Sequence, residues 1–403
     1  MKGKRETLMP ILRSSLPPLE HMIPYFEKIE PNRCHTNFGS LFKQFEERMA
    51  NFLGILPTQI SISCNGTLSL ISSLLAFNIP RDRYCLMPAW TFSATPASAV
   101  LAGLKPYFLD VDRNTQTITP NRVYDFLKSG VIAEHEIGAI MPVSPFGAPI
   151  DRSSWDSFTD KTGIPVLIDA AASFDTILNT PQMSVGQTPM MVSLHATKIF
   201  GIGEGGMIVS TDEELIKRIK GISNFGFDVS RLSSYLGMNC KMSEYQAAIG
   251  HVVLDSWSLI RQQRKEVTAN YIHHFNKIGL KPWLSLDWLT ANCNVFIPGK
   301  AEQVRDHLLA NNIEARTWWG KGCHTHPAYQ NMDRVKDLSN TTYLSDGMLG
   351  VPFSIDTSKE DIEFVCSTID EFLTQNLFFQ DHPRGEKKSD NPTDFSFVKS
   401  ITD

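Results

Sequence analysis

The feature that most constrains the fold of this chain is a regular alternation of short apolar runs with helical patterns between residues 60 and 209. The apolar runs are rich in Ile, Val, Leu and Met and are bounded by turn residues, which is typical of buried strands. We expect strands at the following segments: Ile60–Ser63, Tyr84–Met87, Pro106–Val111, Ala139–Val143, Val166–Ile168, Met190–Leu194 and Met207–Val209. Intervening segments such as Leu68–Phe77 and Ser93–Ala102 have the composition of helices. Strands that alternate with helices predict an α/β fold with a layered sheet.

The second half of the chain predicts a different organisation. Residues 243–278 contain no proline and many good helix formers, so we expect one long helix there. After it we expect these elements: a strand at Asn294–Ile297, a helix at Ala301–Asn311, a strand at Ile313–Thr317 and an amphipathic helix at Lys359–Thr374. A chain of 403 residues suits a large domain plus a smaller one. We predict a large domain at 1–255, a small C-terminal domain at 256–378, and a polar, disordered tail at 379–403.

Composition excludes several classes of protein. The chain is 42% hydrophobic and 20% charged, as in an ordinary soluble globular protein. A formal net charge of -5 provides no basic field for nucleic acid or for an anionic membrane, and no apolar stretch is long enough to span a bilayer. The seven cysteines are scattered without a Cys-x-x-Cys spacing, which favours free thiols in a reducing compartment. We expect a cytoplasmic protein.

One segment carries most of the chemical information. Residues 193–198 read Ser-Leu-His-Ala-Thr-Lys, and residues 203–206 read Gly-Glu-Gly-Gly, so Lys198 lies just after a predicted strand and beside a glycine-rich turn. A lysine that is partly desolvated there has a lowered pKa and a neutral amine, which can form an imine with an aldehyde cofactor. A lysine near glycines is more often a surface residue, so this spacing alone does not decide its role.

Four further segments occur together with the Lys198 segment: Asn65-Gly66-Thr67, residues 88–95 (Pro-Ala-Trp-Thr-Phe-Ser-Ala-Thr), Asp169-Ala170-Ala171, and residues 237–244 (Gly-Met-Asn-Cys-Lys-Met-Ser-Glu). In this order they resemble the motifs of the DegT–DnrJ–StrS family of sugar-nucleotide aminotransferases, over about residues 15 to 375. Five motifs in register are far more specific than any one of them. The resemblance implies the aspartate-aminotransferase (type I) fold, with a large mixed-sheet domain and a small C-terminal domain, and pyridoxal 5'-phosphate (PLP) as cofactor.

The resemblance implies two catalytic residues. Lys198 forms the Schiff base with PLP and, once released, acts as general base and acid. Asp169 follows the predicted strand at Val166–Ile168, at the edge where α/β sheets bind ligands. Its carboxylate keeps the pyridine nitrogen protonated, so that the ring can withdraw electrons.

Other cofactor contacts are implied by the same motifs. Gly66 and Thr67 open a helical run whose N–H groups can face the phosphate, and Ser193 adds a hydroxyl. Phe92 matches the aromatic residue that stacks on the cofactor ring, although Trp90 is a competing candidate. Asn239 matches an asparagine that reaches the phosphate of the neighbouring subunit, which implies a homodimer with shared active sites.

Substrate contacts are less strongly indicated. The resemblance points to His324, within a Cys-His-Thr-His segment at residues 323–326, and we add Trp90 and Asn224 as candidates for binding the sugar nucleotide. Cysteine and two histidines so close together can also bind a metal. We predict no metal site, because no second ligand cluster is visible in the sequence.

Two positions depart from the family pattern. Ala172 stands where the family has Gln or His near the phenolic oxygen of the cofactor, and alanine cannot form that hydrogen bond. Lys241 stands where the family has arginine, so the charge is kept but the bidentate geometry is lost.

The implied reaction is transamination of a nucleotide-linked keto-deoxysugar, with glutamate as the amino donor, for surface polysaccharide or O-antigen biosynthesis. We favour a 4-keto-6-deoxyhexose and amination at C4 over C3; no residue pattern identifies dTDP, UDP or GDP. One alternative is a PLP enzyme of the same fold with other chemistry, such as a cyclitol aminotransferase or a sugar dehydratase. Lys198 argues against the dehydratases, which replace this lysine. Another is a non-catalytic regulatory or binding relative, which Ala172 keeps open.

Overall fold

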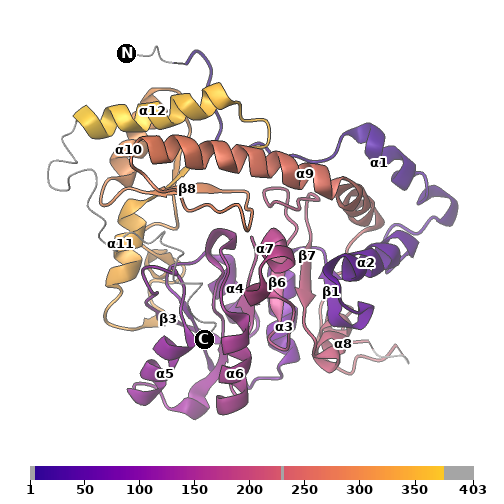
Figure 1. Ribbon diagram of the computed structural model, residues 1–403. Helices are drawn as coiled ribbons and strands as arrows, with labels where there is room; N and C mark the ends of the chain where they lie inside the picture. The colour runs from indigo at the N-terminus through magenta and orange to yellow at the C-terminus, as the bar shows by residue number, and fades with distance from the viewer. Residues whose placement is uncertain (1–4, 228–230, 376–403) are drawn as a thin grey trace.

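A computed structural model describes residues 5–227 and 231–375 of the chain. The predicted tail at 379–403 lies outside the described residues. Eight strands, arranged in two sheets of four, lie at the centre of the described chain (Figure 1). The strands are β1 (Ile60–Ser63), β2 (Tyr84–Pro88), β3 (Lys105–Leu109), β4 (Ile137–Ile140), β5 (Ile168–Asp169), β6 (Met190–Ser193), β7 (Gly206–Val209) and β10 (Asp333–Arg334).

Two four-stranded sheets, ordered β1-β7-β6-β5 and β10-β3-β2-β4, meet along β4 and β5. Parallel bridges join Ile140 to Val166 and Val143 to Asp169, so the two sheets continue into one another. Strand β7 is antiparallel to both of its neighbours, whereas β2, β3 and β4 are parallel to one another. The predicted α/β class with a mixed sheet is therefore confirmed.

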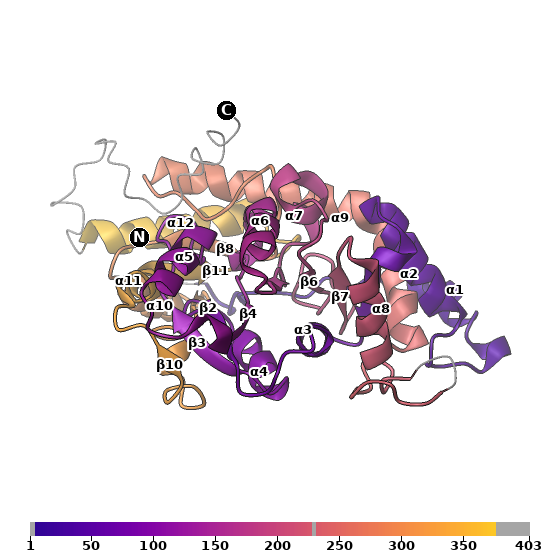
Figure 2. The same ribbon diagram turned by 90° about the horizontal axis from the view of Figure 1, so that it is seen from below.

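Helices cover both faces of this sheet (Figure 2). One face packs against α3 (Gly66–Ala76), α4 (Ala94–Leu101) and α8 (Glu213–Ile222). The other packs against α2 (Ser40–Leu53), α5 (Pro120–Lys128), α6 (Arg152–Thr162), α7 (Phe174–Asn179) and α9 (Glu244–Lys277).

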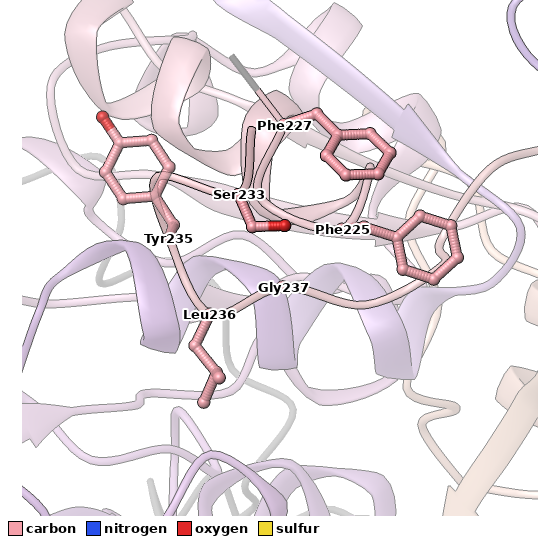
Figure 3. Close-up of a pocket in the computed structure, with 6 residues that line it drawn as sticks. All are labelled: Phe225, Phe227, Ser233, Tyr235, Leu236 and Gly237. Atoms are coloured by element: carbon pink, nitrogen blue, oxygen red, sulfur yellow. The ribbon is translucent and has the colours of Figure 1, made fainter. Parts of the chain in front are cut away.

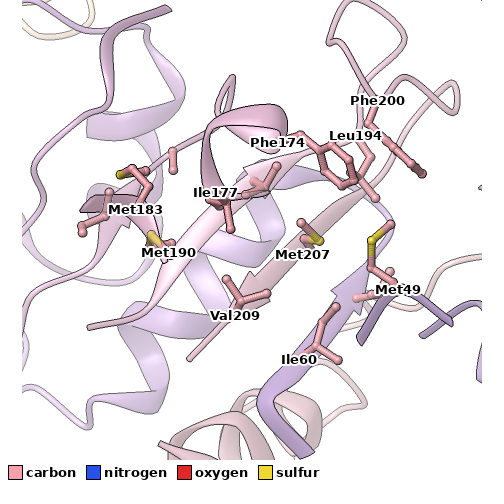
Figure 4. Close-up of a cluster of buried hydrophobic side chains, with 14 of the residues drawn as sticks. Met49, Ile60, Phe174, Ile177, Met183, Met190, Leu194, Phe200, Met207 and Val209 are labelled. Atoms are coloured by element: carbon pink, nitrogen blue, oxygen red, sulfur yellow. The ribbon is translucent and has the colours of Figure 1, made fainter. Parts of the chain in front are cut away.

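The alternation of side chains along each strand explains these two layers. In β6, Met191 belongs to the core under α3, whereas Met190 and Val192 belong to the core on the opposite face. Figure 4 shows part of the second core, where Met190 lies near Met183 and Ile177, and Met207 lies toward Phe174 of α7. Because both faces are buried, strands such as β2, β6 and β7 are apolar at nearly every position.

The predicted long helix is α9, which has 34 residues and a length of about 51 Å. It begins at a capping box in which Ser243 and Gln246 bind each other's backbone N–H groups. Its first part packs against α1 (Leu19–Phe26) and α2, and its later part packs against α12 (Lys359–Gln375) (Figure 1). The Glu244 carboxylate accepts hydrogen bonds from the N–H groups of Leu41 and Phe42, and so caps the N-terminus of α2.

The C-terminal part contains a separate antiparallel sheet in the order β8-β11-β9. Its strands are β8 (Cys293–Phe296), β9 (Arg316–Thr317) and β11 (Met348–Val351), and its helices are α10 (Ala301–Ala310), α11 (Ser339–Gly347) and α12. Strands β8 and β11 and helices α10 and α12 share a core that includes Val295, Val304 and Leu349. Backbone pairing joins segments that are far apart in the sequence: Met9 pairs with Ile313, and β10 pairs with β3 of the central sheet. The boundary at residue 255 stays a prediction.

Short 3-10 turns occupy Glu30–Asn32, Pro57–Gln59, Glu134–Glu136, Pro145–Gly147, Pro181–Met183 and Cys323–Thr325. All seven cysteines lie within the described residues and none of them forms a disulfide, as the sequence predicted. Across residues 5–227 and 231–375, the helices are too short or too polar to cross a membrane.

Candidate active site

The two predicted catalytic residues lie at the carboxyl ends of adjacent parallel strands. Asp169 ends β5 and pairs with Met191 of β6, and Ser193 ends β6. Five residues later, the chain turns through a hydrogen bond from the Lys198 N–H to the His195 carbonyl. This edge of a parallel sheet is where α/β proteins bind their ligands.

The Asp169 carboxylate is buried, with 5% of the residue exposed. Its Oδ2 accepts a hydrogen bond of 2.7 Å from the Thr95 hydroxyl, and its Oδ1 accepts one of 3.2 Å from the Ala171 N–H. Burial raises the pKa of Asp169, while Thr95, Ala171 and the charge of Lys198 act in the opposite direction.

The Lys198 amine has the complementary property. Burial lowers the pKa of Lys198, and the negative charge of Asp169 partly opposes that effect. The two groups therefore lie close enough to affect each other's ionisation. The side chain of Lys198 also keeps part of its surface exposed. A desolvated amine on a residue that is partly exposed is suited to nucleophilic attack on an aldehyde.

The predicted phosphate turn lies at the N-terminus of α3. Asn65 caps this helix by accepting a hydrogen bond from the Leu68 N–H, so the preceding N–H groups of Gly66 and Thr67 point out of the helix end. A Cβ atom on Gly66 would lie 3.3 Å from the Cβ of Ser193, which places the serine beside this turn. Helix dipole, backbone N–H groups and a hydroxyl together form an arrangement that binds phosphate.

Gly206, the last glycine of the Gly-Glu-Gly-Gly segment, allows the phosphate turn to take its place. A Cβ atom on Gly206 would lie 2.6 Å from backbone atoms of Asn65 and Gly66. Only a residue without a side chain permits β7 to approach the turn this closely.

The two aromatic candidates have opposite environments. Phe92 is 62% exposed, so one face of its ring is free to stack on a ligand. Trp90 is fully buried: its Nε1 donates a hydrogen bond to Gln116 and its ring contacts Trp319 at 4.7 Å. The structure thus leaves Trp90 no surface for a cofactor or substrate, and its contacts favour a packing role.

The structure brings His326, rather than His324, next to the Phe92 segment. His326 Nδ1 lies 3.3 Å from the Ser93 hydroxyl, and its Nε2 lies 3.1 Å from the Trp319 carbonyl. His324 packs near Phe108. The family resemblance in the sequence pointed to His324. The turn at Cys323–Thr325 determines which of the two imidazoles faces Ser93. Within residues 5–227 and 231–375, no group of three metal-binding side chains is assembled.

Asn224 and Asn239 lie next to each other as an antiparallel bridge. Lys241 Nζ donates to Asn224 Oδ1 at 3.4 Å and lies 4.4 Å from the centre of the Phe225 ring. Asn239 is exposed, and the following Cys240 carbonyl accepts a hydrogen bond from the Cys64 N–H, just before the phosphate turn.

Ala172, which replaces the family's Gln or His, is half-buried. Its carbonyl oxygen faces Gly147, so closely that a Cβ atom on Gly147 would lie 2.6 Å from that oxygen.

Sequence reasoning missed several polar residues that organise this site. Thr95 and Thr91 are fully buried and hydrogen-bonded to each other at 2.7 Å. The Gln246 amide donates to the Glu204 carbonyl at 2.7 Å and to the Cys64 carbonyl at 3.3 Å. Thr95 is the last residue of the 88–95 motif that contains Phe92, so that motif was the sequence feature that could have identified it.

Comparison with known proteins agrees with this geometry. A family model described as the DegT/DnrJ/EryC1/StrS aminotransferase family matches residues 19–370. The dTDP-4-amino-4,6-dideoxy-D-glucose transaminase of Shigella dysenteriae is 30% identical over 375 residues, which cover 90% of this chain and 98% of that protein.

Solved structures are similar over the same length. A Bacillus cereus protein assigned to the PLP-dependent aminotransferases has a TM-score of 0.82 and 29% identity, and covers 90% of this chain and 99% of its own. DesI, crystallised in the presence of its TDP-sugar product, has a TM-score of 0.81 and 25% identity, with coverage of 94% and 96%. The predicted fold, that of the PLP-dependent aminotransferases, is confirmed.

Proposed function

Because the chain belongs to the DegT/DnrJ/EryC1/StrS aminotransferase family, we propose that it uses PLP to transfer an amino group to a nucleotide-linked keto-sugar. The observation that carries this proposal is the approach of Lys198 to the buried Asp169 carboxylate, beside the N-terminus of α3. An amine of lowered pKa, an anion and a phosphate-binding helix end are the three features that PLP chemistry requires.

The residues present fit this cofactor. The N–H groups of Gly66 and Thr67 and the Ser193 hydroxyl would hold the phosphate, and the exposed Phe92 ring would cover one face of the pyridine. Asp169 is a buried carboxylate held by neutral donors, so it can pair with a protonated ring nitrogen. Bound PLP supplies an aldehyde and a ring that withdraws electrons from the substrate carbon.

Lys198 would carry the protons. Its Nζ has a lowered pKa, so the neutral amine can remove the proton from the substrate carbon that bears nitrogen. The same Nζ, now protonated, can return that proton to the cofactor side, and the charge of Asp169 stabilises the cationic form of Lys198 between the two transfers.

The substrate proposal rests on the similar proteins. Glutamate is proposed as the amino donor and a 4-keto-6-deoxyhexose linked to a nucleotide as the acceptor, for surface polysaccharide or O-antigen biosynthesis. The name of the dTDP-4-amino-4,6-dideoxy-D-glucose transaminase supports amination at C4 and a dTDP-type nucleotide. The TDP-sugar product of DesI supports the same type of nucleotide.

We also propose a homodimer in which Asn239 reaches the cofactor phosphate of the neighbouring subunit. An apolar pocket is lined by Phe225, Phe227, Ser233, Tyr235, Leu236 and Gly237, which is two residues before Asn239 in the sequence (Figure 3). Leu236 and Tyr235 are strongly exposed, and burial against a second subunit would remove this apolar surface from water.

Spectroscopy of the purified protein tests the cofactor and the reaction. Wild type with PLP is expected to show a visible absorbance band that borohydride fixes covalently to Lys198, as peptide mapping would show. Glutamate should remove the band, and a panel of dTDP-, UDP- and GDP-linked keto-sugars should identify the acceptor that restores it. NMR of the aminated product would then distinguish C4 from C3.

A matched pair of lysine variants controls this experiment. Lys198→Ala should lose the covalent band, whereas Lys217→Ala, at a side chain that is 78% exposed, should keep it. Wild type that stays colourless with excess PLP would contradict the cofactor proposal. A coloured protein that no amino donor changes would favour a regulatory or binding relative, the alternative that Ala172 suggests.

A further inference from the structure

Two threonines lie in the same segment as Phe92, residues 88–95, and connect this segment to Asp169. The Thr95 hydroxyl lies 2.7 Å from Asp169 Oδ2, and the Thr91 hydroxyl lies 2.7 Å from that of Thr95. Both threonines are fully buried, so water cannot replace either hydroxyl. Thr91 precedes α4 and Thr95 is its second residue, and Phe92 lies between them in the sequence.

The directions of these hydrogen bonds follow from the charge of the carboxylate. An ionised Asp169 can only accept, so the single proton of the Thr95 hydroxyl must point to it. The Thr95 oxygen is then an acceptor, and Thr91 donates to it. Each donation polarises the next hydroxyl, which strengthens the bond to the carboxylate.

We propose that Thr95, supported by Thr91, is a positioning residue that orients the Asp169 carboxylate and holds it in the charged form that the cofactor ring needs. This inference rests on the proposed use of PLP. Thr95 fixes Oδ2 and the Ala171 N–H fixes Oδ1, so the plane of the carboxylate is set from both sides. The remaining lone pairs are left for a protonated ring nitrogen.

The surroundings of Asp169 explain why such a device is needed. Burial raises the pKa of this carboxyl group, and the hydrogen bond from Thr95 is the largest contribution that lowers it. A protonated Asp169 would leave the ring nitrogen without its counter-charge. The same short segment thus presents Phe92 to the cofactor face and fixes the acid at the cofactor edge.

The test compares three conservative variants. Thr95→Val keeps the shape of the side chain and removes the donor, and is expected to weaken PLP binding about tenfold to a hundredfold. It should also raise the pH midpoint of the visible absorbance of the bound cofactor by about one pH unit, because a less charged ring withdraws fewer electrons. Thr95→Ser keeps the hydroxyl and should bind PLP within about threefold of wild type. Thr91→Val should show a smaller change in the same direction.

Thr188→Val is the matched control. Thr188 is also buried and donates a hydrogen bond of 2.6 Å to a carboxylate, that of Asp156, but it precedes β6 at the opposite end of the strand from Ser193. It should lower stability without changing PLP affinity or the pH midpoint. Thr95→Val with wild-type affinity and midpoint would overturn the inference. Should Thr95→Val fail to fold, Thr91→Val with both wild-type values would overturn it equally, whereas wild type that binds no PLP would refute the proposed function instead.

Discussion

Protonation of His251 is expected to destabilise the fold at mildly acidic pH. This ring is 1% exposed, in α9, and stacks on Tyr25 of α1. Its Nε2 lies 3.0 Å from the Leu41 carbonyl of α2, and its Nδ1 lies 2.8 Å from the Arg48 guanidinium. Since a guanidinium can only donate, Nδ1 must accept, and the ring is neutral with its proton on Nε2.

The expected loss of stability follows from the shift in pKa. Burial and then the Arg48 charge lower the pKa of His251 from 6.5 to about 4, against the opposing effects of Leu41 and Asp255. Between these pH values the unfolded chain binds a proton that the folded protein excludes, so stability falls as pH falls. At about 1.4 kcal/mol per pH unit, the full effect is about 3 kcal/mol, complete near pH 4, and about 2 kcal/mol of it is lost by pH 5.

Denaturant unfolding of wild type and His251→Gln at pH 7.5 and pH 5 measures this effect. Glutamine can accept from Arg48 and donate to the Leu41 carbonyl, but it does not titrate. Wild type should therefore lose about 2 kcal/mol more than His251→Gln over this range. His273→Gln, at an exposed ring of the same helix, should behave as wild type. Equal pH dependence in wild type and His251→Gln would refute the reasoning.

Three further changes should have measurable effects. Asp175→Asn should lower the free energy of unfolding in denaturant by about 3 kcal/mol, because it breaks an ion pair with Arg261 in which the Asp175 side chain is 0% exposed. Glu244→Gln should cost about 1 kcal/mol in the same assay, because the cap on α2 loses its charge. Gly206→Ala should weaken PLP binding at least about tenfold in a fluorescence titration, because the new Cβ would displace the backbone of Asn65.

Much of the large-domain fold could be predicted from local pattern. The predicted strands at residues 60–63 and 190–194 match β1 and β6 almost residue for residue, because each is an apolar run with a turn after it. The ends of β4 and β5 were less accurate, since strand ends depend on the partner: Val166 makes only an isolated bridge to Ile140. Strand β10 carries no pattern of its own, because Asp333 and Arg334 are exposed and their pairing with β3 is purely tertiary.

The site shows the same limit. The motif around Lys198 identified the chemistry, because an amine, a serine and glycines occur together within 14 residues of sequence. The contact of Thr95 with Asp169 joins residues that are 74 positions apart, and no local pattern reports it. Trp90 looked like a ligand contact because aromatic residues suit both packing and binding, and only the fully buried environment next to Gln116 distinguishes the two.

Asp169 and Asp175 show why residue type alone could not assign the roles in this segment. Both carboxylates are buried and lie on either side of the same turn, and burial raises the pKa of each. Asp175 pairs with the Arg261 guanidinium and accepts from the Leu289 N–H, so its charge is used to join α7 to α9 and to the chain before β8. Within the part of the chain that the structure describes, the hydrogen-bond donors to Asp169 are neutral and lie at 2.7 and 3.2 Å, so its charge remains available to a cation at the sheet edge. The partners of each carboxylate therefore distinguish the one that stabilises the fold from the one that is available to a ligand. The hydroxyl of Thr95, the Ala171 N–H and the charge of Lys198 all oppose the rise in the pKa of Asp169 that burial causes.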